Sequence, residues 1–595
     1  MSRATILCCP QITPLDARLA RLTEFLGIEC SLQTLRGQGA GLAPDSALLG
    51  RDHQCLMVSA AALGSLTESE GAPGQFLQRL LDRTKYLLVY GFRPDASDAS
   101  IVRQLSQGLV ESLIGLPRGY HEYTISSDWR PLTKEFTGLV FGPIQSGIDS
   151  VFSGPSLSPA LRPIISIAGS PSFAAFTRGG CTIFILGTSD IADVDMRLKD
   201  QLRVVDWFSR VIPAAMFLRH ALGRHRWHRP QPSASFIIDD LLLKETYGFL
   251  NYRQLLRATS DQSFAATIAF IPYNFRRSQA SVVDLFRSHP NRLSLCIHGC
   301  DHTGGEFATT NLLALNAMAR LADDRMRAHE KTTALPYGKI MVFPQGRFSA
   351  ASLKALQSNG YMAAVNTSPI PEDSAPGDDL TLGEWLDVAV TRYHGFPLFV
   401  RRYPGELVNF AFDLFFGKTL LIVEHHTAFK HGYRDIAAFV AALNSLNPHL
   451  RWAGLREALS HSYLQRDLSN DTVGVRLWTS YTVLSNAGTS PKKYLIQKVE
   501  SAEASLRQVL VDGCPADYVL DNGLLRMAIE IQPLAARVVE IRYANNLPSD
   551  NKGIGLRTTL GIHARRRLSE FRDDFLCWQH RLQTLAGLGD ERRSS

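Results

Sequence analysis

Short apolar runs alternate with amphipathic stretches through the first 229 residues of the chain. The runs are rich in β-branched and aromatic residues and lie at positions 4–9, 54–59, 86–90, 137–141 and 181–186. Helix-like amphipathic stretches, such as 15–26 and 101–114, separate several of them. This alternation predicts a mostly parallel sheet with helices on its faces, loosely similar to Rossmann-like sheets.

A long helical pattern and a basic segment close this first region. Residues 195–222 are predicted to form one helix, kinked or broken at Pro213 because proline removes a backbone donor. Residues 224–232 follow as a basic, proline-closed segment that we interpret as a solvated linker. We therefore predict an N-terminal α/β domain over residues 1–229, whose function the sequence does not reveal.

The pattern changes after residue 468. Runs of alternating character follow one another without intervening helices and are separated by turn residues such as Asp512-Gly513. Closely spaced strands of this kind predict a β-sandwich-like domain over residues 469–595. The last part, about 556–585, is predicted to contain an Arg-rich helix that packs back on a neighbouring domain.

Composition narrows the class of protein. A chain of 595 residues with 45% hydrophobic residues can bury several cores, and the net charge of +7 is a mild excess. No basic stripe interleaved with aromatics is present, so we expect no nucleic-acid partner. Nine scattered cysteines without a Cys-x-x-Cys pair argue against a disulfide framework or a structural zinc knuckle. The sequence shows neither a signal peptide nor a transmembrane segment, which predicts a cytoplasmic protein.

The middle segment, residues 230–468, carries the candidate chemistry. An apolar strand at 235–238 ends in Asp239 and Asp240, and another at 293–297 ends in His298, with His302 four residues later. Two adjacent carboxylates repel each other unless a cation or a shared proton relieves them. Asp240 with the two histidines would form a two-histidine, one-carboxylate face that leaves positions open for water and substrate.

Two further strands end in polar clusters. Residues 340–343 lead into Pro344-Gln345-Gly346, and residues 420–424 lead into His425 and His426. Each cluster alone is consistent with an ordinary turn or a buried histidine. Together, four clusters that each follow an apolar strand predict one face of a barrel-like sheet, where catalytic groups collect.

The order and spacing of these motifs resemble the polysaccharide deacetylase family, also called the NodB homology domain or carbohydrate esterase family four. The resemblance covers Pro230 to His461 and implies a distorted (β/α) barrel. It implies that Asp239 is the general base and that a divalent metal, zinc, is held by three ligands: Asp240, His298 and His302.

The resemblance also assigns the remaining motifs. It implies that Pro344, Gln345 and Gly346 form the floor of the substrate groove, with the Gln345 amide helping to hold the oxyanion. It makes His425 the general acid, with His426 as the competing candidate.

Some positions depart from the family pattern. Val342 stands where the family has the arginine that orients the base, and Leu241 follows Asp240 where glycine is commonest. Arg347 and Arg402 are the candidate substitutes for that arginine.

The resemblance implies a metal-dependent hydrolase that removes N-acetyl or related acyl groups from a carbohydrate in bacterial polysaccharide metabolism. Three alternatives stay open at the level of the sequence: an O-acetyl ester substrate, a non-sugar amide substrate, or a catalytically silent glycan-binding protein.

Overall fold

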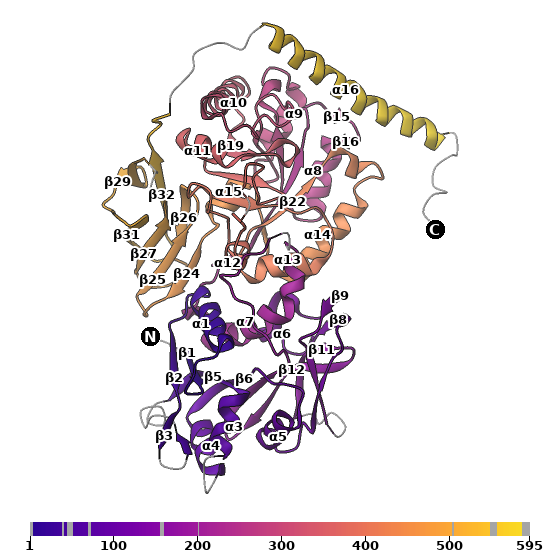
Figure 1. Cartoon of the computed structure of the whole chain (residues 1–595). Helices are drawn as coiled ribbons and strands as arrows, with labels where there is room; N and C mark the ends of the chain where they lie inside the picture. The colour runs from indigo at the N-terminus through magenta and orange to yellow at the C-terminus, as the bar shows by residue number, and fades with distance from the viewer. Residues whose placement is uncertain are drawn as a thin grey trace.

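A nine-stranded mixed sheet organises the N-terminal part of the protein (Figure 1). The computed structural model describes residues 4–38, 41–43, 52–68, 73–154, 160–199, 202–375, 377–501, 505–547 and 556–585. The strands run in the order β2-β1-β5-β6-β13-β12-β11-β8-β9. Their bounds are β1 (Ala4–Cys8), β2 (Cys30–Thr34), β5 (His53–Ser59), β6 (Thr84–Tyr90), β8 (Gly119–Ile125), β9 (Val140–Ser146), β11 (Arg162–Ile167), β12 (Ser170–Arg178) and β13 (Cys181–Leu186).

The sheet is parallel on one side only. Strands β2, β1, β5, β6 and β13 are parallel neighbours, as the alternating pattern predicts. From β13 to β9 every neighbouring pair is antiparallel. The prediction of a mostly parallel sheet is therefore wrong for this half, because the two-residue connections from β11 to β12 and from β12 to β13 permit only hairpins. The sheet is accompanied by α1 (Pro14–Phe25), α3 (Ala60–Glu68), α4 (Pro73–Asp82), α5 (Ala96–Leu105), α6 (Arg130–Thr133) and the small ribbons β3 (Arg36–Gln38) with β4 (Gly41–Ala43) and β7 (Ser112–Gly115) with β10 (Ser150–Ser153).

The long helix predicted over 195–222 is shorter than expected. Helix α7 spans Phe208–Leu222, follows the 3-10 turn Val204–Trp207, and continues through Pro213. The preceding backbone is used differently: Leu198 N–H donates to Leu380 O, and Gly383 N–H donates to Val194 O. These bonds to the middle of the chain replace the intrahelical bonds that the prediction assumed.

The basic segment after α7 is packed rather than solvated. Arg226 is buried, and Arg229 donates to the hydroxyls of Thr419 and Ser233. The backbone of Trp227 bonds Leu26 O, and His228 pairs with Gln465. The segment therefore connects three parts of the protein, and its interpretation as a solvated linker is wrong.

Seven parallel strands form a barrel in the middle of the chain. They run in the order β21-β20-β19-β18-β17-β14-β22, and every neighbouring pair is parallel. The two edges meet at Arg402, two residues after the end of β21: its N–H donates to Leu421 O at 2.8 Å, and its carbonyl accepts from Val423 N–H at 2.9 Å. The distorted (β/α) barrel is thus confirmed. Its strands are β14 (Ser233–Asp239), β17 (Ala266–Phe270), β18 (Leu293–His298), β19 (Tyr337–Val342), β20 (Ala363–Asn366), β21 (Leu398–Val400) and β22 (Leu420–Glu424), and β23 (Arg451–Trp452) pairs with β14.

Helices cover the outside of the barrel. Strands such as β14 are buried along their whole length, which explains why they appear in the sequence as continuous apolar runs rather than alternating ones. Polar side chains cap the helices at their N-termini, for example Asn311 on α10 and Ser349 on α11. The helices are α8 (Tyr252–Asp261), α9 (Ala280–Ser288), α10 (Leu312–Thr333), α11 (Ala350–Ser358), α12 (Leu382–Leu386), α13 (Leu407–Phe415), α14 (Arg434–Leu446) and α15 (Leu455–Ser460), with a hairpin of β15 (Thr246–Tyr247) and β16 (Leu250–Asn251).

Two small sheets follow the barrel and form the predicted β-sandwich. Their orders are β24-β25-β27-β31-β30 and β26-β32-β28-β29, and apolar side chains from both sheets form one core. The strands are β24 (Leu464–Asp467), β25 (Thr472–Leu477), β26 (Tyr481–Ser485), β27 (Lys492–Val499), β28 (Leu506–Val511), β29 (Cys514–Pro515), β30 (Val519–Asp521), β31 (Leu524–Ile531) and β32 (Ala536–Tyr543).

The last described element, α16 (Leu556–Leu585), leaves the sandwich and returns to the barrel (Figure 1). It lies over the side of the barrel that carries β15, β16 and α9. This confirms the prediction that the Arg-rich helix packs back on a neighbouring domain. Among the described residues, no helix combines the length and the apolar character needed to cross a membrane.

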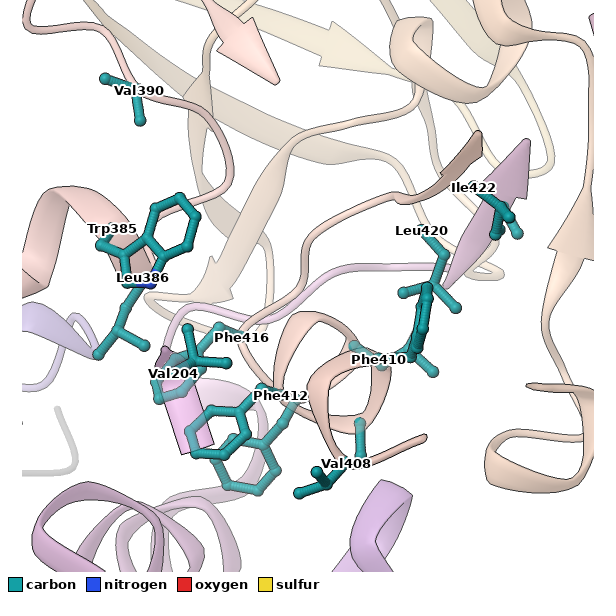
Figure 2. Close-up of a cluster of buried hydrophobic side chains, with 14 of the residues drawn as sticks. Val204, Trp385, Leu386, Val390, Val408, Phe410, Phe412, Phe416, Leu420 and Ile422 are labelled. Carbon is teal, nitrogen blue, oxygen red and sulfur yellow. The ribbon is translucent and has the colours of Figure 1, made fainter. Parts of the chain in front are cut away.

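One apolar core joins the N-terminal sheet to the barrel. Figure 2 shows Val204, from the turn before α7, beside Phe412 of α13 and Phe416, the residue that follows this helix. The ring of Phe412 also packs edge-on against Phe136 and Phe208, at centroid distances of 5.4 and 6.1 Å. The two parts therefore bury aromatic side chains against each other.

We predict that Phe412→Ala destabilises the protein by about 3–5 kcal/mol. Removal of the buried phenyl ring loses the free energy of its transfer out of water and also leaves a cavity in the core. A lower denaturant midpoint in fluorescence-monitored unfolding measures this. Leu534→Ala, at a side chain that is 84% exposed, is the control and should leave the midpoint unchanged. Equal midpoints for Phe412→Ala and wild type would show that the aromatic contact does not hold the two parts together.

Candidate metal centre and active site

Two adjacent carboxylates at the end of β14 point to different partners. Asp239 is the last residue of the strand, and Asp240 follows it with a left-handed φ of 71°. This conformation is uncommon for a residue with a side chain, and it turns the chain sharply. Asp239 is consequently buried inside the barrel, whereas the Asp240 side chain is 28% exposed at its mouth.

The structure brings Asp240, His298 and His302 together. The Nε2 atoms of His298 and His302 lie 3.2 and 2.8 Å from Asp240 Oδ1, and the three donor atoms all fall within 4.8 Å of one another. Asp240 Oδ1 is buried and has no well-aligned hydrogen-bond partner. Two imidazoles and a carboxylate are donors that a divalent ion such as zinc prefers, so these residues fit a metal ion.

The orientation of His298 suits a metal ligand. Its Nδ1 lies 3.0 Å from the carbonyl oxygen of Val342 on the neighbouring strand β19. When Nδ1 carries the proton and donates to that carbonyl, Nε2 is left with a free lone pair toward Asp240. The backbone carbonyl of Val342 thus favours the His298 tautomer that carries its proton on Nδ1.

Glu306 holds the loop that carries His302. Its carboxylate accepts the backbone N–H groups of four consecutive residues at 2.7 to 3.3 Å: Cys300, Asp301, His302 and Thr303. His302 itself has a left-handed φ of 57°. One carboxylate thus satisfies four backbone donors of this loop and stabilises its conformation. No pattern in the sequence pointed to Glu306.

Arg401 orients the predicted base. Its Nη1 donates to Asp239 Oδ1 at 2.8 Å and its Nη2 contacts Oδ2 at 2.7 Å, and both side chains are almost fully buried. The candidates named from the sequence have other partners: Arg402 pairs with Asp413, and Arg347 pairs with Glu372 at the surface. Arg401 directly follows the apolar strand β21, so the signal that identified the other motifs could also have found it.

Burial and these partners set the charges of the carboxylates. Burial alone would raise the pKa of Asp239, but the Arg401 guanidinium and His298 outweigh it and lower the pKa below its usual range. Burial would likewise raise the pKa of Asp240, and its two histidine neighbours lower it well below the usual range. Both carboxylates are therefore ionised at neutral pH.

The turn Pro344–Gly346 lies beside the group of Asp240, His298 and His302. It follows β19, and Gln345 adopts a left-handed φ of 58°. Asn366 Nδ2 donates to Gly346 O at 2.8 Å, and the ring of Pro344 packs so closely on Gly299 that a β-carbon there would come within 2.4 Å. The turn and the loop after His298 thus form adjoining parts of the same mouth.

The two candidate acids have different surroundings. The His425 ring is partly exposed and stacks beside Tyr403 at a centroid distance of 6.1 Å. The His426 ring is buried, with Nε2 3.7 Å from Asp573 of α16 and Nδ1 against Gly248, where a β-carbon would come within 2.4 Å. Both nitrogens of His426 therefore face the protein, whereas the His425 side chain is partly exposed.

Comparisons with known proteins extend this description. No protein-family model matches the chain, and no curated protein matches it. Among solved structures, Agd3, described as a novel carbohydrate deacetylase, is 9% identical with a TM-score of 0.44, over 91% of this chain and 98% of its own.

Two further structures match a smaller part. A family 4 carbohydrate esterase from Streptomyces lividans is 11% identical with a TM-score of 0.23, over 38% of this chain and 92% of its own. A family 4 pseudoenzyme from Bacillus anthracis is 11% identical with a TM-score of 0.24, over 39% of this chain and 66% of its own. These matches are to carbohydrate deacetylases and family 4 esterases. At these low identities and TM-scores they assign no activity, metal or substrate to this chain.

We predict that Glu306→Gln weakens zinc binding by about 10- to 100-fold, a typical effect of removing a group that positions a metal ligand. In the wild type both carboxylate oxygens of Glu306 accept backbone N–H groups. In the variant an NH₂ group, which is itself a donor, would replace one of these oxygens, so the His302 loop would shift. Competition with a chromophoric chelator measures the affinity without reference to activity. Glu372→Gln, which alters the surface pair with Arg347, is the control and should bind zinc like the wild type. Equal zinc affinities of Glu306→Gln and Glu372→Gln would show that Glu306 does not position a metal ligand.

Proposed function

We propose that the protein is a metal-dependent hydrolase that removes N-acetyl or related acyl groups from a carbohydrate, in bacterial polysaccharide metabolism. One observation carries the proposal: an ionised Asp239, fixed by Arg401, lies next to the Asp240, His298 and His302 set at one mouth of a parallel barrel. A base beside an open three-donor site is the arrangement that hydrolysis of an unreactive amide requires.

Each residue has a defined task in this proposal. A zinc ion held by Asp240, His298 and His302 would lower the pKa of a water molecule and polarise the amide carbonyl. Asp239 accepts the proton of the attacking water, and Arg401 keeps its carboxylate charged and oriented. The Gln345 N–H donates to the oxygen that becomes negative.

His425 completes the reaction in this proposal. As the C–N bond breaks, it protonates the leaving nitrogen, so that one amide and one water give acetate and a free amine. Its ring is partly exposed, whereas both nitrogens of His426 are enclosed. Pro344, Gln345 and Gly346 are proposed to form the floor on which the sugar lies.

The alternative of a silent glycan-binding protein is less well supported. Its main reason was Val342, which occupies the position of the family arginine. Arg401 supplies the same kind of contact to Asp239 from another strand, so the loss at Val342 is compensated.

The test is acetate release from N-acetylated oligosaccharides. We expect Asp239→Asn to lower turnover by about 100- to 10,000-fold, the usual contribution of a general base, with little change in substrate affinity. His425→Gln should also lower turnover strongly, whereas His426→Gln, its matched neighbour, should retain most of it.

Binding and metal measurements complete the experiment. Titration of each variant with substrate separates binding from turnover, and elemental analysis should find about one metal ion per wild-type chain and much less in His298→Ala. Full activity of Asp239→Asn would refute its role as base. Tight binding of several glycans that are never hydrolysed would support the alternative of a silent glycan-binding protein. Equal metal content in His298→Ala and in the wild type would refute the proposed metal site.

We predict that Arg401→Met moves the acid limb of the kcat/KM profile to higher pH by about 1–3 units. The base works only when ionised, so activity falls as the pH drops through the pKa of Asp239. In the wild type Arg401 lowers that pKa, and in the variant burial remains and raises it. Arg347→Met is the control, since the ion pair of Arg347 is with the surface carboxylate Glu372 and not with Asp239, and its profile should match the wild type. An unshifted limb in Arg401→Met would show that another group limits the rate at low pH.

A further inference from the structure

Helix α16 has its polar side against the protein and its apolar side outward. The buried side chains of its inner face are mostly charged or polar: Ile562, Arg566, Glu570, Asp573 and Cys577. Surface helices of folded proteins normally show the opposite arrangement, with the apolar face inward. The inversion means that the packing of α16 on the barrel does not account for its apolar residues.

The inner face is tied to the barrel by specific polar contacts. Asp573 accepts a hydrogen bond from the hydroxyl of Tyr247 at 2.9 Å and lies beside His426. Glu570 accepts from Arg277 Nη2 at 2.7 Å. These contacts fix the rotation of the helix, so the direction of its outer face is set by the fold.

The outer face carries a continuous apolar stripe. Its side chains repeat at alternating intervals of three and four residues and are exposed by 44–70%: Leu568, Phe571, Phe575, Trp578 and Leu582. At about 1.5 Å per residue the stripe is about 21 Å long. An exposed apolar surface of this kind, with three aromatic rings, marks an interaction site.

Exposed arginines flank the stripe. Arg565, Arg567 and Arg572 are exposed, and Asp574 is the one exposed carboxylate among the described side chains of 561–583. Arg567 and Arg572 are 72% and 68% exposed, although each also contacts an inner-face carboxylate, Glu570 and Asp573 respectively. Tryptophan, phenylalanine and leucine between arginines is the composition of a helix that lies in the interface of an anionic bilayer.

A second copy of the helix fits this surface less well. In a parallel pair joined along the stripe, Arg567 of one copy would face Arg572 of the other, because these positions flank a three-four repeat. Like charges in those positions oppose pairing, whereas anionic lipid headgroups complement them. The positive charge on both sides of the stripe therefore favours binding to an anionic lipid surface over pairing with a second copy of the helix.

We propose that α16 is an interfacial docking helix: its outer stripe of Leu568, Phe571, Phe575, Trp578 and Leu582 inserts into the headgroup region of an anionic bilayer. The inner face would then hold the mouth of the barrel close to that surface. The inference is independent of the proposed hydrolysis, because it rests on the exposed face of α16 alone.

The test uses the full chain with vesicles of phosphatidylcholine, alone or mixed with phosphatidylglycerol. We expect co-sedimentation with the mixed vesicles that weakens as salt is added, and little with phosphatidylcholine alone. Brominated acyl chains should quench tryptophan emission in the wild type and much less in Trp578→Phe, since Trp578 is the tryptophan on the stripe.

Variants separate the two parts of the surface. Phe571→Ser with Phe575→Ser removes apolar area, and Arg567→Glu with Arg572→Glu reverses the charge; each pair should weaken binding more than about tenfold. Leu534→Ser with Val519→Ser changes equally exposed apolar residues on other elements and should bind like the wild type. Unchanged circular dichroism and zinc content verify that each variant is folded.

Several outcomes would overturn the proposal. These are no binding to either vesicle, binding that the stripe variants leave intact, or equal loss in the control pair. Sedimentation velocity without lipid supplies another: a dimer that Phe571→Ser with Phe575→Ser dissociates would assign the stripe to a second copy.

Discussion

The site depends on keeping two neighbouring carboxylates charged in a buried position. Asp239 and Asp240 are adjacent in sequence, and without compensation one of them would take up a proton. The left-handed backbone at Asp240 sends the two groups to separate partners, a guanidinium inside the barrel and two imidazoles at its mouth. This division of partners keeps both carboxylates ionised although they are adjacent in the sequence.

Satisfying that constraint requires long-range structure. Arg401 lies 162 positions from Asp239 and reaches it only because the barrel closes, and His302 is placed by a loop that Glu306 holds from within. The geometry therefore comes from strand ends that meet at one mouth and from a loop that is ordered by its own carboxylate.

Sequence patterns predicted the parts of the site that are local. Asp239, Asp240 and His298 each follow a continuous apolar strand, and such runs identify buried parallel strands well. Arg347 and Arg402 were the wrong candidates for the orienting arginine because the choice depends on which side chain faces the barrel interior. Adjacent residues on a strand end, such as Arg401 and Arg402, face opposite ways, and only the register of the closed sheet distinguishes them. The inner contacts of α16 likewise depend on pairings between distant segments, whereas the antiparallel half of the first sheet contains two local hairpins.

The seam of the barrel gives Arg401 a second importance. Beside it, two backbone hydrogen bonds at Arg402 join β21 to β22, whereas β14 and β22 are in register over five residue pairs. The guanidinium of Arg401, next to these two hydrogen bonds, forms an ion pair with Asp239 at the end of β14. The pKa of Asp239 is lowered in the folded protein. The folding stability that this ion pair contributes is therefore present at neutral pH and is lost as the pH falls through that pKa. Acid that protonates Asp239 would therefore weaken the ion pair that links the end of β14 to the residue after β21.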